Sequence, residues 1–193
     1  MPMNTETLKD YLLTRRSVGM AFLKEPGPDA DQLQTLLEIG TRVPDHGKLA
    51  PWRLVLIEGE ARAEAGEALA RIVAARNPDA EEAALDVERR QFLPAPLTIG
   101  VLFSPRPAAK APELEQLLSA GAVCLNLVHG ANALGFAACW VTRWYTFDPE
   151  AQGALGARGG ERFVGFVHIG TPTISPDERE RPAIEDVVSR WPG

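Results

Sequence analysis

Residues 42–52 read RVPDHGKLAPW and lead directly into the apolar run Trp52–Ile57. Two prolines stiffen this segment, which also carries two cations, a histidine and a tryptophan. Such a composition is typical of a functional loop ahead of a buried strand on an α/β scaffold. A simple connector that places its tryptophan in the core would look the same, so the neighbouring elements must be considered.

Apolar runs and helically spaced apolar residues alternate along the rest of the chain. Buried strands are predicted over residues 52–57, 96–103, 136–142 and 162–169. Helices are predicted before residue 15, from a cap at residue 29 or 31 through residue 39, over residues 60–76, 81–90 and 113–134, and from residues 148–150. This alternation favours an α/β fold over an all-helical fold or a sandwich.

The predicted helix over residues 113–134 is apolar nearly all round, which is typical of a helix in the centre of a domain. The stretch Ser119–Val141 is long enough to suggest a transmembrane span, but it contains Asn126, His129 and Asn132. A buried helix followed by a strand explains it better, so no membrane association is expected.

Length and charge limit the possible partners and the compartment. The 193 residues suffice for one α/β domain, and 26 acidic against 20 basic residues give a net charge of −6, which argues against nucleic-acid binding. The N-terminus has no signal-peptide pattern. Cys124 and Cys139 lie in apolar surroundings, which indicates buried thiols in a reducing compartment. The protein is therefore expected in the cytoplasm.

The chain carries none of the patterns of a self-sufficient catalytic site. Its three histidines are single, so no zinc or iron site is predicted. No P-loop occurs, no G-x-G-x-x-G follows a first strand, and no G-x-S-x-G elbow is present. No catalytic side chain is assigned, and if the protein is an enzyme, a cofactor is expected to supply the chemistry.

Arg15, Arg16 and Ser17 place two guanidiniums and a hydroxyl at the end of the first predicted helix. Arginine pairs bidentately with phosphate and also donates to heterocyclic carbonyls. Alternatively, the two cations are exposed and only offset the negative end of the helix dipole. By itself the cluster leaves both interpretations open.

The order of these motifs resembles a known family. Arg-Arg-Ser, an apolar helix and the pattern P-D-H-x-x-x-x-P-W at residues 44–52 are similar to the nitroreductase superfamily, most closely its small, single-domain bacterial branch. The resemblance runs the length of the chain, through residues 140–142 and 164–172 to the pair Arg181-Pro182. Each motif alone is weak, whereas their order and spacing are specific.

The resemblance implies an α/β (α+β) nitroreductase-like fold, with a central mixed, mainly antiparallel sheet flanked by helices, in a single domain over residues 1–193. It also implies a homodimer with FMN at the subunit interface, and residues 171–193 as a C-terminal arm on the partner subunit. By pattern alone the apolar residues of this tail fit their own domain equally well. They are Ile184, Val187, Val188 and Trp191.

The resemblance also assigns cofactor-binding residues. Arg15, Arg16 and Ser17 would hold the phosphate, the ribityl chain and the pyrimidine edge of FMN. Arg181 would complete the phosphate site. The remaining matching positions are Arg42 and His46, which would reach the flavin of the dimer, and Trp140, Val141 and Thr142, which would line it.

Three positions depart from the family's pattern. Many members carry Lys or Arg near flavin N1 where this chain has Gly19, and Gln where it has Ala50. The loss of a cation near N1 is expected to lower the flavin's redox potential unless another group compensates, and Lys48 is the candidate. A Glu-Gly pair after the third strand is replaced by Trp140-Val141, so the substrate range does not carry over.

The resemblance implies an FMN-dependent reductase that uses NAD(P)H in a ping-pong hydride transfer to nitro compounds, quinones or other small electron-poor acceptors. One alternative keeps FMN but performs dehydrogenation, dehalogenation or flavin fragmentation. Another is a flavin-binding module without turnover. Residues 130–135 are tied to the pyridine nucleotide in some relatives, or they pack the long helix against the following strand.

Overall fold

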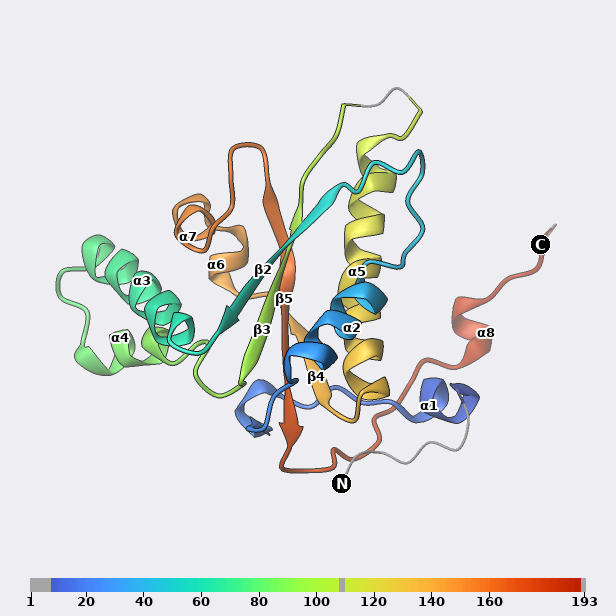
Figure 1. Cartoon of the computed structure of the whole chain (residues 1–193), viewed down its shortest axis with the longest axis horizontal. Coiled ribbons are helices and arrows are strands. Elements are labelled where there is room, and N and C mark those ends of the chain that lie inside the picture. The colour runs from blue at the N-terminus through green and yellow to red at the C-terminus, as the bar shows by residue number, and fades with distance from the viewer. Residues whose placement is uncertain (1–7, 108–109, 192–193) are drawn as a thin grey trace.

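The computed structural model describes residues 8–107 and 110–191, and a five-stranded sheet lies at its centre (Figure 1). The long strand β5 (Arg162–Pro172) pairs with β3 (Leu97–Phe103) on one side and with β4 (Ala137–Val141) on the other. Strand β2 (Trp52–Glu58) pairs with β3, and the short β1 (Leu23–Lys24) pairs with the end of β5. Every one of these pairings is antiparallel.

Helices cover both faces of this sheet. Val167 and Ile169 of β5 point into one cluster with α2 (Ala30–Gly40) and α5 (Glu113–Ala133). Phe166 points to the other face, where α3 (Ala61–Arg76), α6 (Trp144–Phe147) and α7 (Pro149–Ala154) pack. The charged α4 (Glu82–Arg89) lies against α3 and has no buried residue. The predicted α/β fold with a mainly antiparallel sheet between helices is confirmed.

The contact between α2 and α5 explains the glycines at the ends of these helices. Asp29 caps α2 in a capping box with Gln32. At Gly40 a Cβ would lie 2.4 Å from Leu127, and at Gly130 a Cβ would lie 2.9 Å from Leu36. Residues 130–135 therefore include a packing position, but Gly130 packs on α2 rather than on the following strand.

Long-range pairing extends the sheet beyond the prediction. Strand β5 continues to Pro172, three residues past the predicted end, because Thr171 and Pro172 pair with the two residues of β1. The short elements β1, α6 and α8 (Ile184–Val187) and a 3-10 turn at Met20–Phe22 were not predicted. Two to four residues are too few for a periodic pattern.

Helix α5 differs from the prediction in its surroundings. The sheet and α2 bury one side of it, whereas Leu114, Leu118 and Leu125 remain 65%, 64% and 43% exposed. These leucines are spaced by four and seven residues, so they lie on one face. An apolar periphery therefore does not mean that the single chain covers the helix all round.

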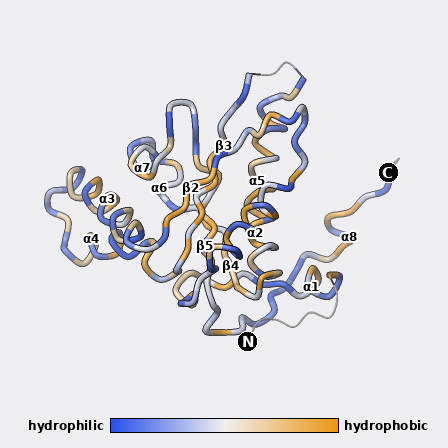
Figure 2. The backbone as a smooth tube through the Cα atoms, viewed as in Figure 1, coloured by the Kyte–Doolittle hydropathy of each residue, from blue (hydrophilic) through white to orange (hydrophobic). Residues whose placement is uncertain are grey.

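The C-terminal tail leaves the body after residue 172 and carries α8 away from it (Figure 1). Figure 2 shows an apolar stretch in this arm. The apolar side chains of its last part, Ile184, Val187, Val188 and Trp191, are exposed, up to 95% for Trp191, so this part of the tail does not pack on its own domain. Residues 1–7 and 192–193 of the predicted domain and tail lie outside the described residues. Within the described chain, no helix combines the length and the hydropathy of a membrane span.

Candidate flavin site

The predicted Arg15–Ser17 segment follows α1 (Leu8–Thr14) and runs beside strand β4. The amide of Arg15 donates to the Tyr11 carbonyl (2.8 Å), and the amide of Val18 donates to the Ala138 carbonyl (3.2 Å). Val18 is buried in one cluster with Cys139. The backbone of the segment is therefore anchored on the sheet.

Helix α1 is itself fixed to the end of α5. The Tyr11 hydroxyl lies 2.8 Å from His129 Nδ1, and the two rings meet edge to face. Burial lowers the pKa of His129, and the nearby charge of Arg15 lowers it further. In a neutral His129, Nδ1 can accept a hydrogen bond from the Tyr11 hydroxyl, and this contact positions the arginine that follows α1.

The two arginines of the segment have buried nitrogens without partners. Arg15 Nε and Arg16 Nη1 are both inaccessible and make no hydrogen bond with any described residue. Among the described residues, Arg16 has an acid nearby in Glu178, whose carboxylate lies 3.8 Å away, which is too long for a hydrogen bond. Because an unsatisfied buried donor costs free energy, these nitrogens indicate a site for an acceptor that the described residues do not supply.

The predicted residues Trp140, Val141 and Thr142 lie at the end of the same strand. Val141 packs on the cluster around Val18, whereas Trp140 is 41% exposed at the edge of the sheet. A Cβ at Gly165 on β5 would collide with the indole of Trp140, so this glycine lets the ring lie against the sheet. The structure thus brings β4 and the Arg15–Ser17 segment together.

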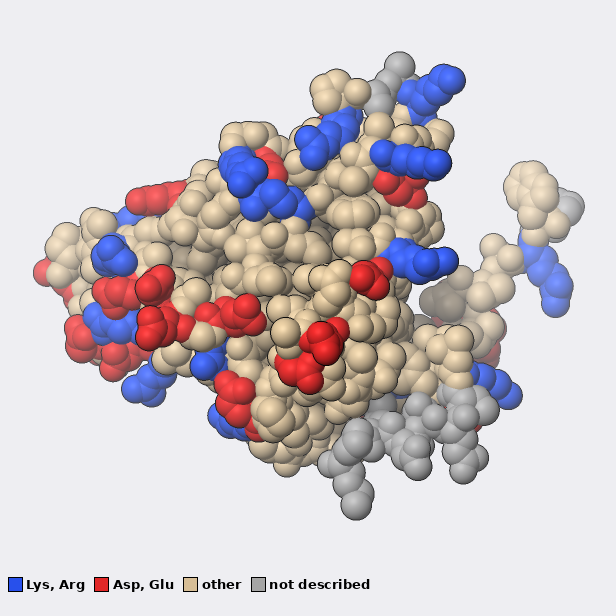
Figure 3. All heavy atoms as spheres, viewed as in Figure 1, with Lys and Arg blue, Asp and Glu red and all other residues tan. Residues whose placement is uncertain are grey.

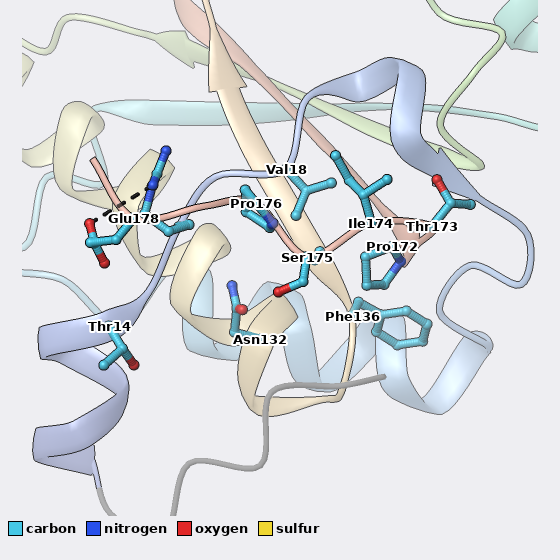
Figure 4. Close-up of a pocket in the computed structure, with 12 residues that line it drawn as sticks. Thr14, Val18, Asn132, Phe136, Pro172, Thr173, Ile174, Ser175, Pro176 and Glu178 are labelled. Atoms are coloured by element: carbon cyan, nitrogen blue, oxygen red, sulfur yellow. Dashed lines mark ion pairs between the residues drawn. The ribbon is translucent and has the colours of Figure 1, made fainter.

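Arg181 reaches the same region through Glu178, whose Oε1 lies 3.6 Å from Arg181 and 3.8 Å from Arg16. A hollow of about 610 Å³ adjoins this carboxylate. Figure 4 shows its lining, which comes from Thr14 of α1, from the end of α5 with the chain to β4, and from residues 172–178 of the tail. Glu178 was not predicted from the sequence, because no local pattern indicates that an acid will lie between two arginines that are far apart in sequence.

The loop at residues 42–50 is held along α5. Ser119 donates to the Pro44 carbonyl (2.7 Å), and Asn126 donates to the Arg42 carbonyl (2.9 Å). The Asp45 carboxylate accepts the amides of Leu49 and Ala50. These bonds stabilise a backbone in which Lys48 and Ala50 both have positive φ, at 55° and 44°.

Arg42 and His46 do not join the other predicted residues within the described chain. Both are exposed, and His46 Nδ1 lies 2.7 Å from Glu115 of α5. No hydrogen bond or ion pair between described residues links this loop to the Arg15–Ser17 segment. The predicted set therefore falls into two groups. One comprises Arg15, Arg16, Ser17, Trp140, Val141, Thr142 and Arg181, and the other Arg42 and His46.

Comparisons with known proteins identify the family of the chain. The sequence model of the nitroreductase family matches residues 12–171. The chain belongs to the nitroreductase family. The resemblance predicted from the motifs is thus confirmed, and the protein is an oxidoreductase.

Relatives and solved structures extend the match over most of the chain. YdjA of Escherichia coli, named as a candidate NAD(P)H nitroreductase, is 35% identical over 165 residues, which are 86% of this chain and 88% of YdjA. A similarly named protein of Haemophilus influenzae is 34% identical over 83% of this chain and 86% of its own length. A nitroreductase-like protein of Bacillus cereus superposes over the full length of both chains, with a TM-score of 0.80 and 24% identity. A nitroreductase of Bacteroides fragilis with bound FMN superposes with a TM-score of 0.69 and 19% identity, over 96% of this chain and 99% of its own.

Proposed function

We propose that this protein is an FMN-dependent oxidoreductase that uses NAD(P)H to reduce nitro compounds, quinones or other small electron-poor acceptors. The observation that carries the proposal is the pair of buried, unpartnered nitrogens of Arg15 and Arg16, on a segment whose backbone runs beside β4, the strand of the exposed Trp140. A phosphate with an aromatic ring system has the chemistry to satisfy both features.

The residues of the first group fit FMN. Within the part of the chain that the structure describes, the one carboxylate paired with Arg16 and Arg181 is that of Glu178, so both arginines retain donors for the phosphate. Arg15 and Ser17 remain for the ribityl chain and the pyrimidine carbonyls. Trp140, Val141 and Thr142 would line the ring from the edge of the sheet. The names of the curated relatives, and the FMN in a solved neighbour of the same fold, support this assignment.

When bound, FMN supplies a ring that takes hydride from NAD(P)H and returns electrons to the acceptor, in alternation at one open face. The chain holds and orients the cofactor and its substrates. No side chain is needed as an obligatory acid or base, because solvent reaches the exposed edge at Trp140. His46 Nδ1 lies within hydrogen-bond distance of the Glu115 carboxylate, which favours a role for His46 in binding rather than as an acid or base.

The proposed enzyme is a homodimer in which residues 171–193 embrace the partner. The exposed leucines of α5 form an apolar face next to Phe147, which is also exposed, and the tail carries further exposed apolar side chains. A chain that leaves this much apolar surface open requires a covering partner, and a second copy offers matching surfaces. The family match ends at residue 171, where the proposed arm begins.

The dimer also accounts for the second group of predicted residues. The loop at residues 42–50 is fixed beside the exposed face of α5 and directs Arg42, His46 and Lys48 outward. Across a two-fold axis these side chains would reach the flavin of the partner subunit. Lys48 would supply there the cation that Gly19 does not provide near N1.

The enzyme is proposed to work in the cytoplasm. Cys124 and Cys139 are both buried and free, as predicted. Burial raises the pKa of Cys124 to about 12 and that of Cys139 to about 11, so both thiols stay protonated and inert. Such cysteines fit a reducing compartment.

The visible absorption spectrum of the purified protein tests the proposal, before and after FMN addition and desalting. We expect flavin bands that co-elute at about one FMN per chain, bleach with NADH or NADPH and return when menadione or a nitroaromatic is added. Retained FMN without bleaching by either nucleotide would identify a flavin-binding module. A colourless protein that retains no FMN would refute both.

A further inference from the structure

A second hollow, of about 320 Å³, lies at the opposite end of the sheet from the tail. It is formed by the start of β2, the chain that follows β3 and the turn that precedes β5. Figure 3 shows Lys and Arg side chains gathered over this end of the molecule, whereas acidic side chains are numerous on the α3–α4 hairpin. The net charge of −6 is thus unevenly distributed.

The floor of this hollow is a closed ion pair between Arg53 and Glu161. Arg53 donates from Nε (3.0 Å) and Nη2 (2.6 Å) to the two carboxylate oxygens, and also to the Gly156 carbonyl. Arg53 holds the pKa of Glu161 at about 2, and the Glu161 side chain is only 8% exposed. The one acid of the lining is therefore ionised, and its charge is already matched.

Two further arginines stand above this floor. Arg106 and Arg158 are exposed, and their guanidiniums have no ion-pair or hydrogen-bond partner among the described residues. Their backbones are nevertheless fixed: Gln116 bonds the amide and the carbonyl of Arg106, and the Arg158 amide donates to Glu161. Two cations are thus held at one hollow although acids outnumber bases in the chain.

The turn that precedes β5, at residues 158–160, exposes its backbone. At Gly159 and Gly160 an added Cβ would meet nothing within 4 Å, and Gly160 has a φ of +82°. The amides of both glycines make no hydrogen bond with a described residue. Free amides between two guanidiniums are suitable donors for the oxygens of a tetrahedral anion.

We propose that this hollow is an anion site that binds the phosphate of a small molecule through Arg106, Arg158 and the amides of Gly159 and Gly160. With the floor neutralised, the two free guanidiniums match the charge of a phosphate dianion. The site is separate from the flavin site, because none of its lining residues belongs to α1, β4 or the tail. It therefore does not depend on the proposed function.

Calorimetric titration of the FMN-saturated protein tests the site, with sodium pyrophosphate as the probe and chloride at matched ionic strength as the blank. We expect saturable binding that weakens at least tenfold in the double variant Arg106→Ala/Arg158→Ala. The matched control is Arg71→Ala/Arg90→Ala, which removes two exposed arginines from the α3–α4 hairpin and is expected to bind pyrophosphate normally.

A titration followed by amide NMR locates the contact, and the Gly159 and Gly160 signals are expected to shift in the wild type alone. Titration with 2′,5′-ADP and with adenosine then distinguishes the source of the phosphate. Tighter binding of 2′,5′-ADP than of pyrophosphate points to a nucleotide, and equal or weaker binding points to a free anion. Absence of saturable binding in the wild type, or unchanged affinity in the Arg106/Arg158 double variant, would overturn the proposal.

Discussion

The Arg15–Ser17 segment and the loop at residues 42–50 both carry predicted cofactor contacts, but their polar groups are satisfied in opposite ways. In the segment, the backbone is anchored while buried guanidinium nitrogens lack acceptors. In the loop, Asp45, Ser119 and Asn126 satisfy the backbone, and the functional side chains are exposed. The segment therefore has buried donors that need a ligand, whereas the backbone of the loop is satisfied and its functional side chains are exposed. The proposed site, shared between two subunits, would account for both states.

Disruption of the dimer should have the largest effect on cofactor binding, because it separates the two regions. We expect Leu118→Asp to weaken self-association at least ~100-fold, or about 2.7 kcal/mol, since it places a carboxylate in the proposed interface. Sedimentation equilibrium measures the change, and retained FMN should fall with it. Val87→Asp on α4 is the matched control, because Val87 is similarly exposed but far from α5. A dimer that persists with unchanged affinity in Leu118→Asp would exclude the α5 face as the interface.

A buried nitrogen that no ligand can reach offers a contrast to the arginines. His168 is fully buried, its Nδ1 bonds Thr98 (2.8 Å), and its Nε2 has no partner among the described residues. Burial lowers its pKa to about 4, so the unfolded chain binds more protons than the folded one between pH 6.5 and 4. Stability should therefore fall as the pH is lowered through this window, by roughly 3 kcal/mol.

Urea unfolding at several pH values measures this loss. His168→Gln, which stays neutral, should have a flatter profile between pH 6.5 and 4 than the wild type. Below pH 4 both proteins should lose stability together, because Arg76 and Arg53 hold the pKa values of Asp148 and Glu161 at about 2. An identical slope in both proteins above pH 4 would show that His168 is not the titrating group.

Loss of the hydrogen bonds that Asp45 accepts within the loop should lower the stability of the fold. We expect Asp45→Ala to destabilise the fold by about 2 kcal/mol, because two amides lose a charged acceptor and Lys48 and Ala50 keep a strained φ. Thermal unfolding measures the effect, and Asp79→Ala on the surface serves as the control. A melting temperature equal to that of the control would mean that the loop is held by its contacts with α5 alone.

Loss of an unpartnered guanidinium should affect the ligand rather than the fold. Arg16→Ala is expected to weaken FMN binding by at least ~1.5 kcal/mol, or about tenfold, with little change in unfolding. Fluorescence titration of FMN measures the affinity, and Arg90→Ala is the control. Unchanged FMN affinity in Arg16→Ala would remove the phosphate site.

The smallest effect is expected at Glu178, which competes with the ligand for Arg16 and Arg181. Glu178→Gln removes the charge at constant size, so FMN binding should tighten roughly two- to fivefold, in keeping with the weakness of exposed ion pairs. The same titration detects it, with Glu180→Gln as the control. Weaker binding in Glu178→Gln would instead make this carboxylate a ligand contact.

The sequence alone was sufficient to predict the longer helices, the four longer strands and the family. These features depend on local periodicity and on motifs such as residues 44–52, which are readable without knowledge of contacts. Which polar groups lack partners became visible only in the folded chain. Buried nitrogens of Arg15 and Arg16 lack partners among the described residues, Glu178 approaches Arg16 from the far end of the chain, and Arg106 lines one hollow with Arg158, which lies 52 residues later. The burial of a group and its hydrogen-bond partners depend on contacts between segments that are distant in sequence, so a local sequence pattern cannot predict them.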